Sequence, residues 1–210
     1  MSSSLHSKKH VDITDLGPAH WLLGLEIKHN RDAKTIALSQ TAYINSILRR
    51  FNLQDIKPVS TPMEVNMQLH SSQVPQTAEE TAEMRNALLW NTVKHVFRYL
   101  NGTKSLWLTY GGVENGFLKG CGDADGSMQE DRHAISGNAF LIDGGAVSWF
   151  SKRQEIVSLS TTESEYVAAT HAAKEALWLR QLISQLFEPI AGPTTIFSDN
   201  QSAIALTKDH

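Results

Sequence analysis

The sequence lacks the features that mark secreted, disulfide-linked and membrane proteins. One cysteine, Cys121, in 210 residues excludes an internal disulfide and a zinc site built from cysteine pairs. No apolar run is long enough to cross a bilayer, and the first fifteen residues lack the apolar segment of a secretion signal. We therefore expect an intracellular protein, in the cytoplasm or nucleus, with no membrane anchor and no disulfide-linked partner.

The charge balance also lacks a basic excess. Nineteen Lys and Arg residues against 22 Asp and Glu residues give a net charge of −3, so no overall basic field attracts nucleic acid. Basic residues instead form local groups, at Arg49–Arg50, at Lys94, Arg98 and Lys104, and at Lys152–Arg153. Each group is either a nucleic-acid contact or a solvated face.

What is present is an ordinary globular composition, with 41% apolar and 20% charged residues. Near the start, two apolar segments, His20–Ile27 and Thr35–Leu38, flank the polar turn His29–Asp32 and predict a hairpin. Apolar residues then recur at helical spacing over 43–51, with Ser39 placed to cap the helix.

The middle of the chain is less regular. Residues 55–76 contain three prolines and predict a linker or extended crossing. Thr77 and Glu80 have capping-box spacing and predict a second helix, whose apolar stripe ends at Asn101–Gly102. A strand over 106–110 follows, and we place the main domain boundary near Gly112.

The last hundred residues predict an α/β unit. The expected strands are 117–123, 137–142, 146–150 and 194–198, and the expected helices are 162–186 and 201–207. Three meandering strands followed by a helix, a parallel strand and a helix are typical of a mixed sheet with helices packed on it.

Acidic residues fall where such a sheet places ligand-binding groups. Asp123 ends the first of these strands and Asp199 ends the fourth. Between them, Glu163 and Glu165 both lie at the start of the long helix. Steps of three or four residues from Glu165 follow an apolar stripe, whereas steps from Glu163 meet mainly polar positions. Glu165 is therefore predicted to face the sheet, and Glu163 to cap the helix or meet solvent.

Capping-box spacing occurs twice here, for Ser160 with Glu163 and for Thr162 with Glu165. If Asp123, Glu165 and Asp199 converge, each ionised pair at about 4 Å and an effective dielectric near 20 costs about 4 kcal/mol. Two Mg²⁺ ions would offset this repulsion and would suit phosphodiester hydrolysis. The alternative, that each acid acts alone as a cap or surface charge, stays open at this point.

Seven short motifs then occur in order. They are Cys121-Gly-Asp-Ala-Asp125, Ile135-Ser-Gly137, Gly144-Gly-Ala-Val-Ser-Trp149, Ser151-Lys152, Leu159-Ser-Thr-Thr-Glu-Ser-Glu-Tyr166, Trp178-Leu-Arg180 and Ser198-Asp-Asn-Gln-Ser-Ala203. Together they resemble the ribonuclease H of Ty1/copia retrotransposons, over about residues 106–210.

The resemblance implies a ribonuclease H-like mixed sheet with flanking helices, in which Asp123, Glu165 and Asp199 are the catalytic, metal-binding carboxylates. It further implies two Mg²⁺ ions, with Mn²⁺ as a substitute, and endonucleolytic cleavage of RNA in RNA–DNA hybrids that leaves a 5′-phosphate and a 3′-hydroxyl. Asp125 is the rival to Asp123. The family favours Asp123 because the acid that directly ends the first strand is the ligand.

Four further residues are candidates for contacts to the hybrid. Thr161 and Asn200 lie beside the expected ligands, although cap and turn duties explain them nearly as well. Lys152 and Arg153 form the local basic group nearest to them in sequence.

The first half resembles the end of a copia reverse-transcriptase palm running into its thumb. The motifs are Asp15-Leu-Gly17, His20-Trp-Leu-Leu-Gly-Leu-Glu-Ile27, Leu38-Ser-Gln40 and Lys57-Pro-Val-Ser-Thr-Pro62. By this resemblance, 1–54 is the end of the palm and start of the thumb, 55–111 a linker with a residual thumb or connection helix, and 112–210 the ribonuclease H-like domain. The resemblance further implies that Trp21–Glu26 match the primer-grip hairpin of the reverse transcriptase; alternatively, these residues are simply an amphipathic hairpin.

Three departures from the family matter. The Tyr-x-Asp-Asp polymerase motif would lie upstream of Met1, so no DNA synthesis is expected. Several dozen residues that the family has between Met84-Arg-Asn86 and Asn91-Thr-Val-Lys94 are absent. The chain stops at Lys208-Asp-His210, before the family's last strand and helix with a fourth acid. We therefore expect the isolated chain to be weakly active or inactive, and the remaining Pol polyprotein segments to be its partners.

Two other functions fit parts of the pattern. A DDE transposase or integrase shares the fold, but its acids run Asp, Asp, Glu, whereas here Glu165 lies between the aspartates. A decayed or co-opted retroelement fragment would act only as a nucleic-acid-binding or interaction module.

Overall fold

A computed structural model describes residues 14, 17–64, 77, 88–112, 118–125, 133–187 and 189–208. Over these ranges the chain is mixed α/β, with eight strands and four helices. The strands form two four-stranded sheets, ordered β1-β2-β3-β4 and β7-β6-β5-β8. The chain divides into two compact units, Met1–His29 with Ala37–Trp107, and Asn30–Ile36 with Leu108–His210. The predicted α/β class is confirmed.

The described residues of the first half of the chain form three short strands and two helices. They are β1 (Trp21–Leu22), β2 (Leu25–Asn30), β3 (Thr35–Ser39), α2 (Thr41–Arg50) and α4 (Leu88–Thr103). All but residues 30–36, which hold the β2–β3 turn, fall in the first unit. The predicted hairpin is confirmed for β2 and β3, with its turn at residues 31–34. The predicted first segment, His20–Ile27, is not continuous, because the chain turns at residues 23–24 and β1 pairs antiparallel with β2.

The start of α2 differs from the prediction that Ser39 caps it. The N-cap residue is Gln40, which makes no capping side-chain bond. The Ser39 hydroxyl accepts the Thr41 backbone N–H at 3.1 Å. Thr41 Oγ1 in turn donates to the Lys104 carbonyl at 2.6 Å. A contact distant in sequence therefore fixes this helix start, and local cap spacing could not reveal it.

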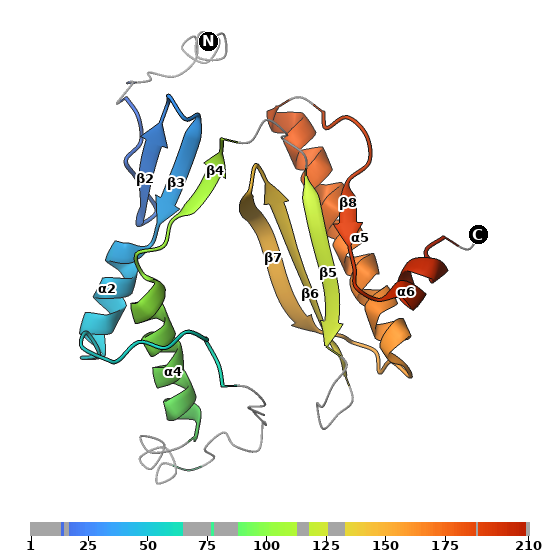
Figure 1. Cartoon of the computed structure of the whole chain (residues 1–210), viewed down its shortest axis with the longest axis horizontal. Helices are drawn as coiled ribbons and strands as arrows, with labels where there is room; N and C mark the ends of the chain where they lie inside the picture. Colours follow the sequence, from blue (N-terminus) through green and yellow to red (C-terminus); the bar gives the residue numbers. More distant parts are fainter. Residues whose placement is uncertain are drawn as a thin grey trace. The chain divides into compact units, whose positions relative to one another are not determined.

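Helices α2 and α4 lie side by side (Figure 1). The Phe51 ring centroid lies 6.4 Å from that of Trp90 and 5.2 Å from that of Phe97. α4 ends at Thr103, close to the predicted Asn101–Gly102 end. The helix start predicted at Thr77 and Glu80 falls mostly outside the described residues.

The segment after α2 crosses α4 as an extended strap. The Arg98 Nε donates to the Lys57 carbonyl at 2.8 Å, and the Asn101 amide donates to the Ile56 carbonyl at 2.8 Å. These bonds explain how a proline-containing stretch without secondary structure is held on the helix.

The second unit holds the other sheet, with strands β5 (Lys119–Asp125), β6 (Ile135–Ile142), β7 (Gly145–Arg153) and β8 (Thr195–Phe197). Its helices are α5 (Thr161–Leu186) and α6 (Gln201–Leu206), and β4 (Leu108–Gly111), a strand of the first sheet, also falls within its residue range. β6 pairs antiparallel with β5 and β7, and β8 pairs parallel with β5. The predicted succession of three meandering strands, helix, parallel strand and helix is confirmed.

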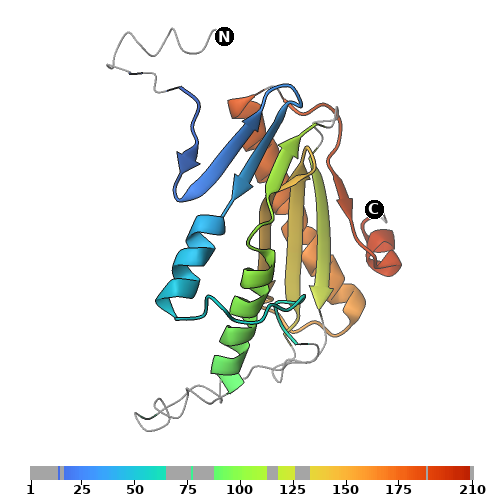
Figure 2. The same cartoon turned by 60° about the vertical axis from the view of Figure 1, so that its left-hand side comes forward.

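The core of this unit lies between the sheet and α5, which runs along one sheet face (Figure 2). Leu118 and Phe140 from the strands meet Ala172, Ala176 and Leu179 from the helix. The carboxyl end of β5 and the start of α5 consequently lie at the same end of the sheet (Figures 1 and 2). Within the described ranges, no helix combines the length and apolar character needed to cross a membrane.

Gly120 offers a test of this packing. A Cβ atom at Gly120 would overlap the ring of Phe140, which is completely buried, whereas a Cβ at Gly137 would meet only the Phe150 carbonyl at 3.9 Å. We expect Gly120→Ala to lower the free energy of unfolding by about 1–3 kcal/mol through overpacking. Gly137→Ala, a matched strand glycine, should be neutral or slightly stabilising. Urea denaturation of both variants measures this, and equal stabilities would contradict the packing described.

Candidate metal centre

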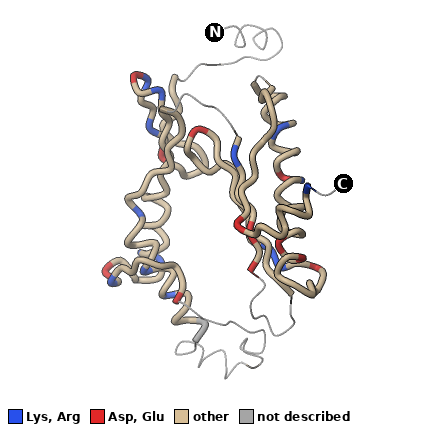
Figure 3. Tube along the Cα trace, turned by 45° about the vertical axis from the view of Figure 1, so that its right-hand side comes forward, with Lys and Arg blue, Asp and Glu red and all other residues tan. Residues whose placement is uncertain are grey.

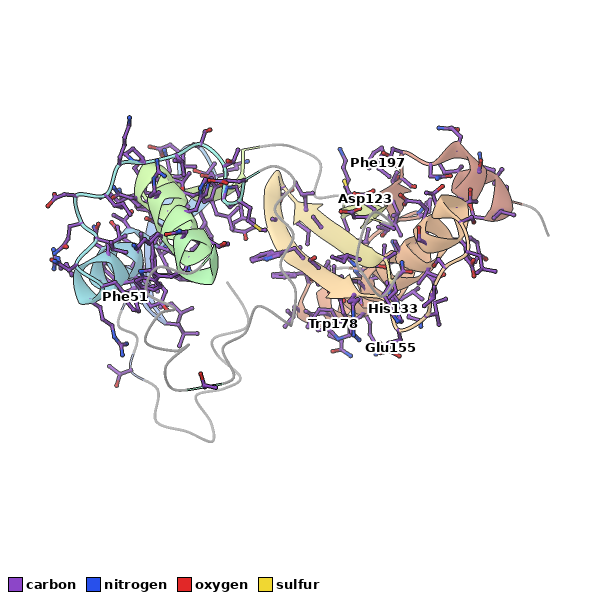
Figure 4. All side chains as sticks on the ribbon, turned by 90° about the horizontal axis from the view of Figure 1, so that it is seen from below. Phe51, Asp123, His133, Glu155, Trp178 and Phe197 are labelled. Atoms are coloured by element: carbon purple, nitrogen blue, oxygen red, sulfur yellow. The ribbon has the colours of Figure 1, made fainter. Side chains whose placement is uncertain are left out.

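Three carboxylates converge in the second unit. Asp123, Glu165 and Asp199 each offer an oxygen, and these oxygens all lie within 4.8 Å of one another. Asp123 lies near the end of β5, Asp199 follows β8, and Glu165 lies near the start of α5. The labelled Asp123 and Phe197 lie on the same side of the unit (Figure 4), and Cys121 pairs with Phe197 in the β5–β8 ladder. The predicted convergence of the three acids is confirmed.

Burial distinguishes Glu165 from its neighbours. Its exposed fraction is 7%, whereas Asp123 and Asp199 are exposed. Burial is the main cause that raises the pKa of Glu165; the Ala124 backbone N–H opposes the rise, and the Asp123 and Asp199 carboxylates add to it. Acidic positions gather in this part of the unit (Figure 3).

The Glu165 carboxylate also has an unsatisfied atom. Its Oε2 is buried and has no hydrogen-bond partner among the described residues. A buried carboxylate oxygen without a partner is costly, because its lost hydration is not replaced. A divalent cation with carboxylate ligands would supply the missing partner and offset the repulsion among the acids. The residues present therefore fit a Mg²⁺ or Mn²⁺ site.

The start of α5 shows why Glu165, and not Glu163, joins the cluster. Ser160 is the N-cap residue, and its hydroxyl accepts the Glu163 backbone N–H at 3.1 Å. The Glu163 carboxylate accepts the Leu159 backbone N–H at 2.7 Å. The predicted Ser160–Glu163 cap is thus confirmed. The second capping pair, Thr162 with Glu165, is wrong, because the single N-cap is Ser160 and Glu165 is buried in the cluster.

Asp125 and Asn200 are not members of the carboxylate cluster. β5 ends at Asp125, so the prediction that Asp123 ends this strand is wrong, because the strand pairing continues for two more residues. Asp125 is nevertheless exposed and is not one of the three clustered acids. Asn200 is the N-cap of α6, where its Oδ1 accepts the Ala203 backbone N–H at 2.9 Å. The cap role weighed for Asn200 is therefore present, and a nucleic-acid contact stays a prediction.

The remaining candidates lie outside the carboxylate cluster. Thr161 is the exposed first residue of α5, and its carbonyl accepts the Ser164 hydroxyl at 2.8 Å. Lys152 is exposed and lies 3.2 Å from the Glu155 carboxylate. Arg153, the exposed last residue of β7, follows it. Their role in binding a hybrid stays a prediction.

Gln154 is a residue that the sequence patterns missed. It follows β7 directly, is 2% exposed, and donates through Nε2 to the Ser136 Oγ and to the Ser164 carbonyl, both at 2.9 Å. A glutamine between charged residues has no cap or apolar pattern to mark it. Only the fold shows that its side chain bridges β6 and α5.

Comparison with known proteins shows similarity to retrotransposon polyproteins. The retrovirus-related Pol polyprotein from transposon TNT 1-94 of Nicotiana tabacum is 36% identical over 238 residues, covering 96% of this chain and 18% of that protein. The retrovirus-related Pol polyprotein from transposon RE2 of Arabidopsis thaliana is 29% identical over 239 residues, covering 98% of this chain and 16% of that protein. The chain is a relative of the Pol polyproteins of copia-type retrotransposons. It spans less than a fifth of the length of these two relatives.

Both Pol alignments are longer than the 210 residues of the chain, so these relatives contain residues that this Pol relative lacks. This supports the predicted internal deletion, whose place between residues 86 and 91 stays a prediction. The secreted RxLR effector protein 161 of Plasmopara viticola is also similar, 43% identical over 91 residues, covering 43% of this chain and 64% of the effector. No family model and no solved structure matches the chain.

The raised pKa of Glu165 predicts a pH effect in metal-free protein. Because this pKa lies above its ordinary value of 4.5, the folded chain binds more protons than the unfolded chain just above pH 4.5. This group's contribution therefore lowers stability as pH rises through that window. Glu165→Gln removes it, so the melting temperature of the variant should gain on that of the wild type as pH increases.

The measurement is thermal unfolding from pH 4 to 8 with EDTA. Glu163→Gln is the matched control, because it changes an acid in the same helical turn outside the cluster. A gain in melting temperature with pH that occurs in Glu165→Gln and not in Glu163→Gln belongs to Glu165. If the melting temperatures of Glu165→Gln and the wild type change in parallel with pH, the raised pKa of the Glu165 carboxyl is contradicted.

Proposed function

We propose that this Pol relative is a retrotransposon-derived ribonuclease H segment that hydrolyses RNA in RNA–DNA hybrids. The observation that carries the proposal is the state of Glu165: its buried Oε2 has no hydrogen-bond partner among the described residues, and one of its carboxylate oxygens lies within 4.8 Å of oxygens from two exposed aspartates. Kinship to Pol polyproteins and a sheet of three antiparallel strands with one parallel strand support it. By this proposal, residues 112–210 form a ribonuclease H-like domain, and 1–111 derive from the end of a reverse transcriptase.

Asp123, Glu165 and Asp199 would hold Mg²⁺, or Mn²⁺ in its place. Two such ions, when bound, supply activation of a water and stabilisation of the departing oxygen in phosphodiester hydrolysis. The chain's own part is to present three carboxylates at the end of one sheet. Glu165 approaches from the buried side, and the exposed Asp123 and Asp199 leave the open side to the substrate.

Substrate binding requires that the phosphate backbone come close to three acids. Without cations, this approach is repulsive. Lys152 and Arg153 at the end of β7, and Thr161 and Asn200 near the cluster, are the proposed contacts to the hybrid. Selection of a hybrid over duplex RNA would come from the 2′-hydroxyls of one strand and the deoxyribose of the other. The remaining Pol segments are the proposed protein partners, in the cytoplasm or nucleus.

A second function, a non-catalytic binding or interaction module, is favoured by one comparison. A protein named as a secreted effector shares 91 aligned residues with this chain, over 64% of its own length. A segment of this kind therefore occurs in a protein that is not named as a Pol polyprotein. Under this alternative, hybrid cleavage is absent.

Cleavage of a labelled RNA–DNA hybrid tests the proposal. With Mg²⁺ or Mn²⁺, the chain should cut the hybrid and leave single-stranded RNA and duplex RNA intact. Mutating a residue that only supports a metal ligand typically lowers metal affinity or activity by about 10–100-fold. The loss of a ligand itself should cost more, so we expect Asp123→Asn, Glu165→Gln and Asp199→Asn each to reduce the cleavage rate by at least about 100-fold.

Asp125→Asn is the control on the same strand and should keep the rate within a few-fold. If Asp125→Asn abolishes cleavage and Asp123→Asn does not, the ligand on β5 has been assigned wrongly. Wild-type protein that cuts no hybrid with either metal would favour the non-catalytic module.

A further inference from the structure

Gln154 is fixed at the end of β7 by every polar group it has. Its backbone N–H donates to the Ala134 carbonyl at 2.7 Å, and its carbonyl lies 2.9 Å from the His133 Nδ1. Its Oε1 accepts the Ser158 hydroxyl at 3.1 Å. Because the backbone is anchored and the side chain is buried, the amide is held in one place.

The two amide hydrogens of Gln154 join the sheet to the helix. One is donated to the Ser136 Oγ on β6 and the other to the Ser164 carbonyl on α5. That carbonyl belongs to the peptide bond between Ser164 and Glu165. Gln154 therefore holds the backbone from which the Glu165 side chain projects.

The other end of Glu165 is tied to the same part of the sheet. The Ala124 backbone N–H hydrogen-bonds the Glu165 carboxylate. Ala124 pairs with Ser136 across the β5–β6 ladder and adjoins Asp123. A closed circuit thus runs from Gln154 through Ser136 and Ala124 to Glu165 and back through the Ser164 carbonyl.

The circuit opposes a force that acts on the helix start. Two neighbouring carboxylates repel Glu165, and its burial costs hydration, so an outward shift of the first turn would relieve both. Helix ends open more easily than helix centres. Two strong amide hydrogen bonds to fixed partners resist this shift.

We propose that Gln154 is a positioning residue for the metal centre, holding Glu165 in reach of Asp123 and Asp199. This inference rests on the proposed function only in assuming that the three carboxylates bind a divalent cation. It assigns Gln154 no contact with substrate.

The test is the affinity of the folded chain for Mn²⁺ alone, measured by electron paramagnetic resonance without nucleic acid. Gln154→Met keeps the length of the side chain and removes both hydrogen bonds that the side-chain amide donates. Since partners of this kind typically contribute 10–100-fold to metal affinity, the Kd for Mn²⁺ should rise by about tenfold or more. Glu165→Gln identifies the part of the binding that belongs to the three carboxylates.

Ser158→Ala is the matched control. It removes one bond of the Gln154 side chain and leaves both amide donors, so it should lower the melting temperature with little change in Kd. If Gln154→Met does not fold, Ser136→Ala removes a single acceptor of the amide and should raise the Kd by a smaller factor. A melting temperature lowered in EDTA with wild-type Kd, in whichever of these two variants folds, would show that Gln154 is only structural.

The arms separate the two proposals. Wild-type Mn²⁺ binding that Glu165→Gln does not weaken would overturn both. Binding that depends on Glu165 and weakens in Gln154→Met, with no hybrid cleavage by the wild type, would retain the positioning role and overturn the proposed hydrolase. Binding that depends on Glu165 and is unchanged in Gln154→Met would overturn only the positioning role.

Discussion

Helix α5 can lie close to β5 because the two surfaces carry almost no side-chain bulk where they meet. A Cβ placed on Gly122 would lie 3.3 Å from the Cβ of Ala172, and Ala168 and Ala172 are at most 1% exposed. Larger residues would push the helix outwards and carry its first turns away from the strand ends. The convergence of Glu165 with two acids from the sheet depends on this close contact.

The carboxylate cluster is asymmetric in its surroundings. One acid is buried under the helix and two are open to solvent. The loss of hydration therefore falls on Glu165 of the helix, whereas the two aspartates near the strand ends remain accessible to solvent. The alanine–glycine contact and the hydrogen bonds of Gln154 lie in the same unit and favour the packed position of the helix start, which this cost opposes.

Sequence periodicity was sufficient for residues whose role follows from a local pattern. The strand pattern predicted that Asp123 and Asp199 lie near strand ends, although β5 itself continues to Asp125, and helical phase separated Glu165 from Glu163, because both signals depend on the neighbours in the chain. Ser39 was misassigned because the partner that fixes α2, Lys104, lies 63 residues away. Gln154 was missed for the same reason, since Ser136 and Ser164 become its neighbours only after the sheet and helix assemble.

The register of the parallel pair β5–β8 sets the relative positions of the two aspartates. Cys121 pairs with Phe197, and each aspartate of the cluster follows its paired residue by two positions. Moving β8 by one residue would turn Asp199 to the opposite face. The two aspartates are therefore aligned by the register of this strand pair and not by the length of the loop between α5 and β8, which can change without moving β8 along β5.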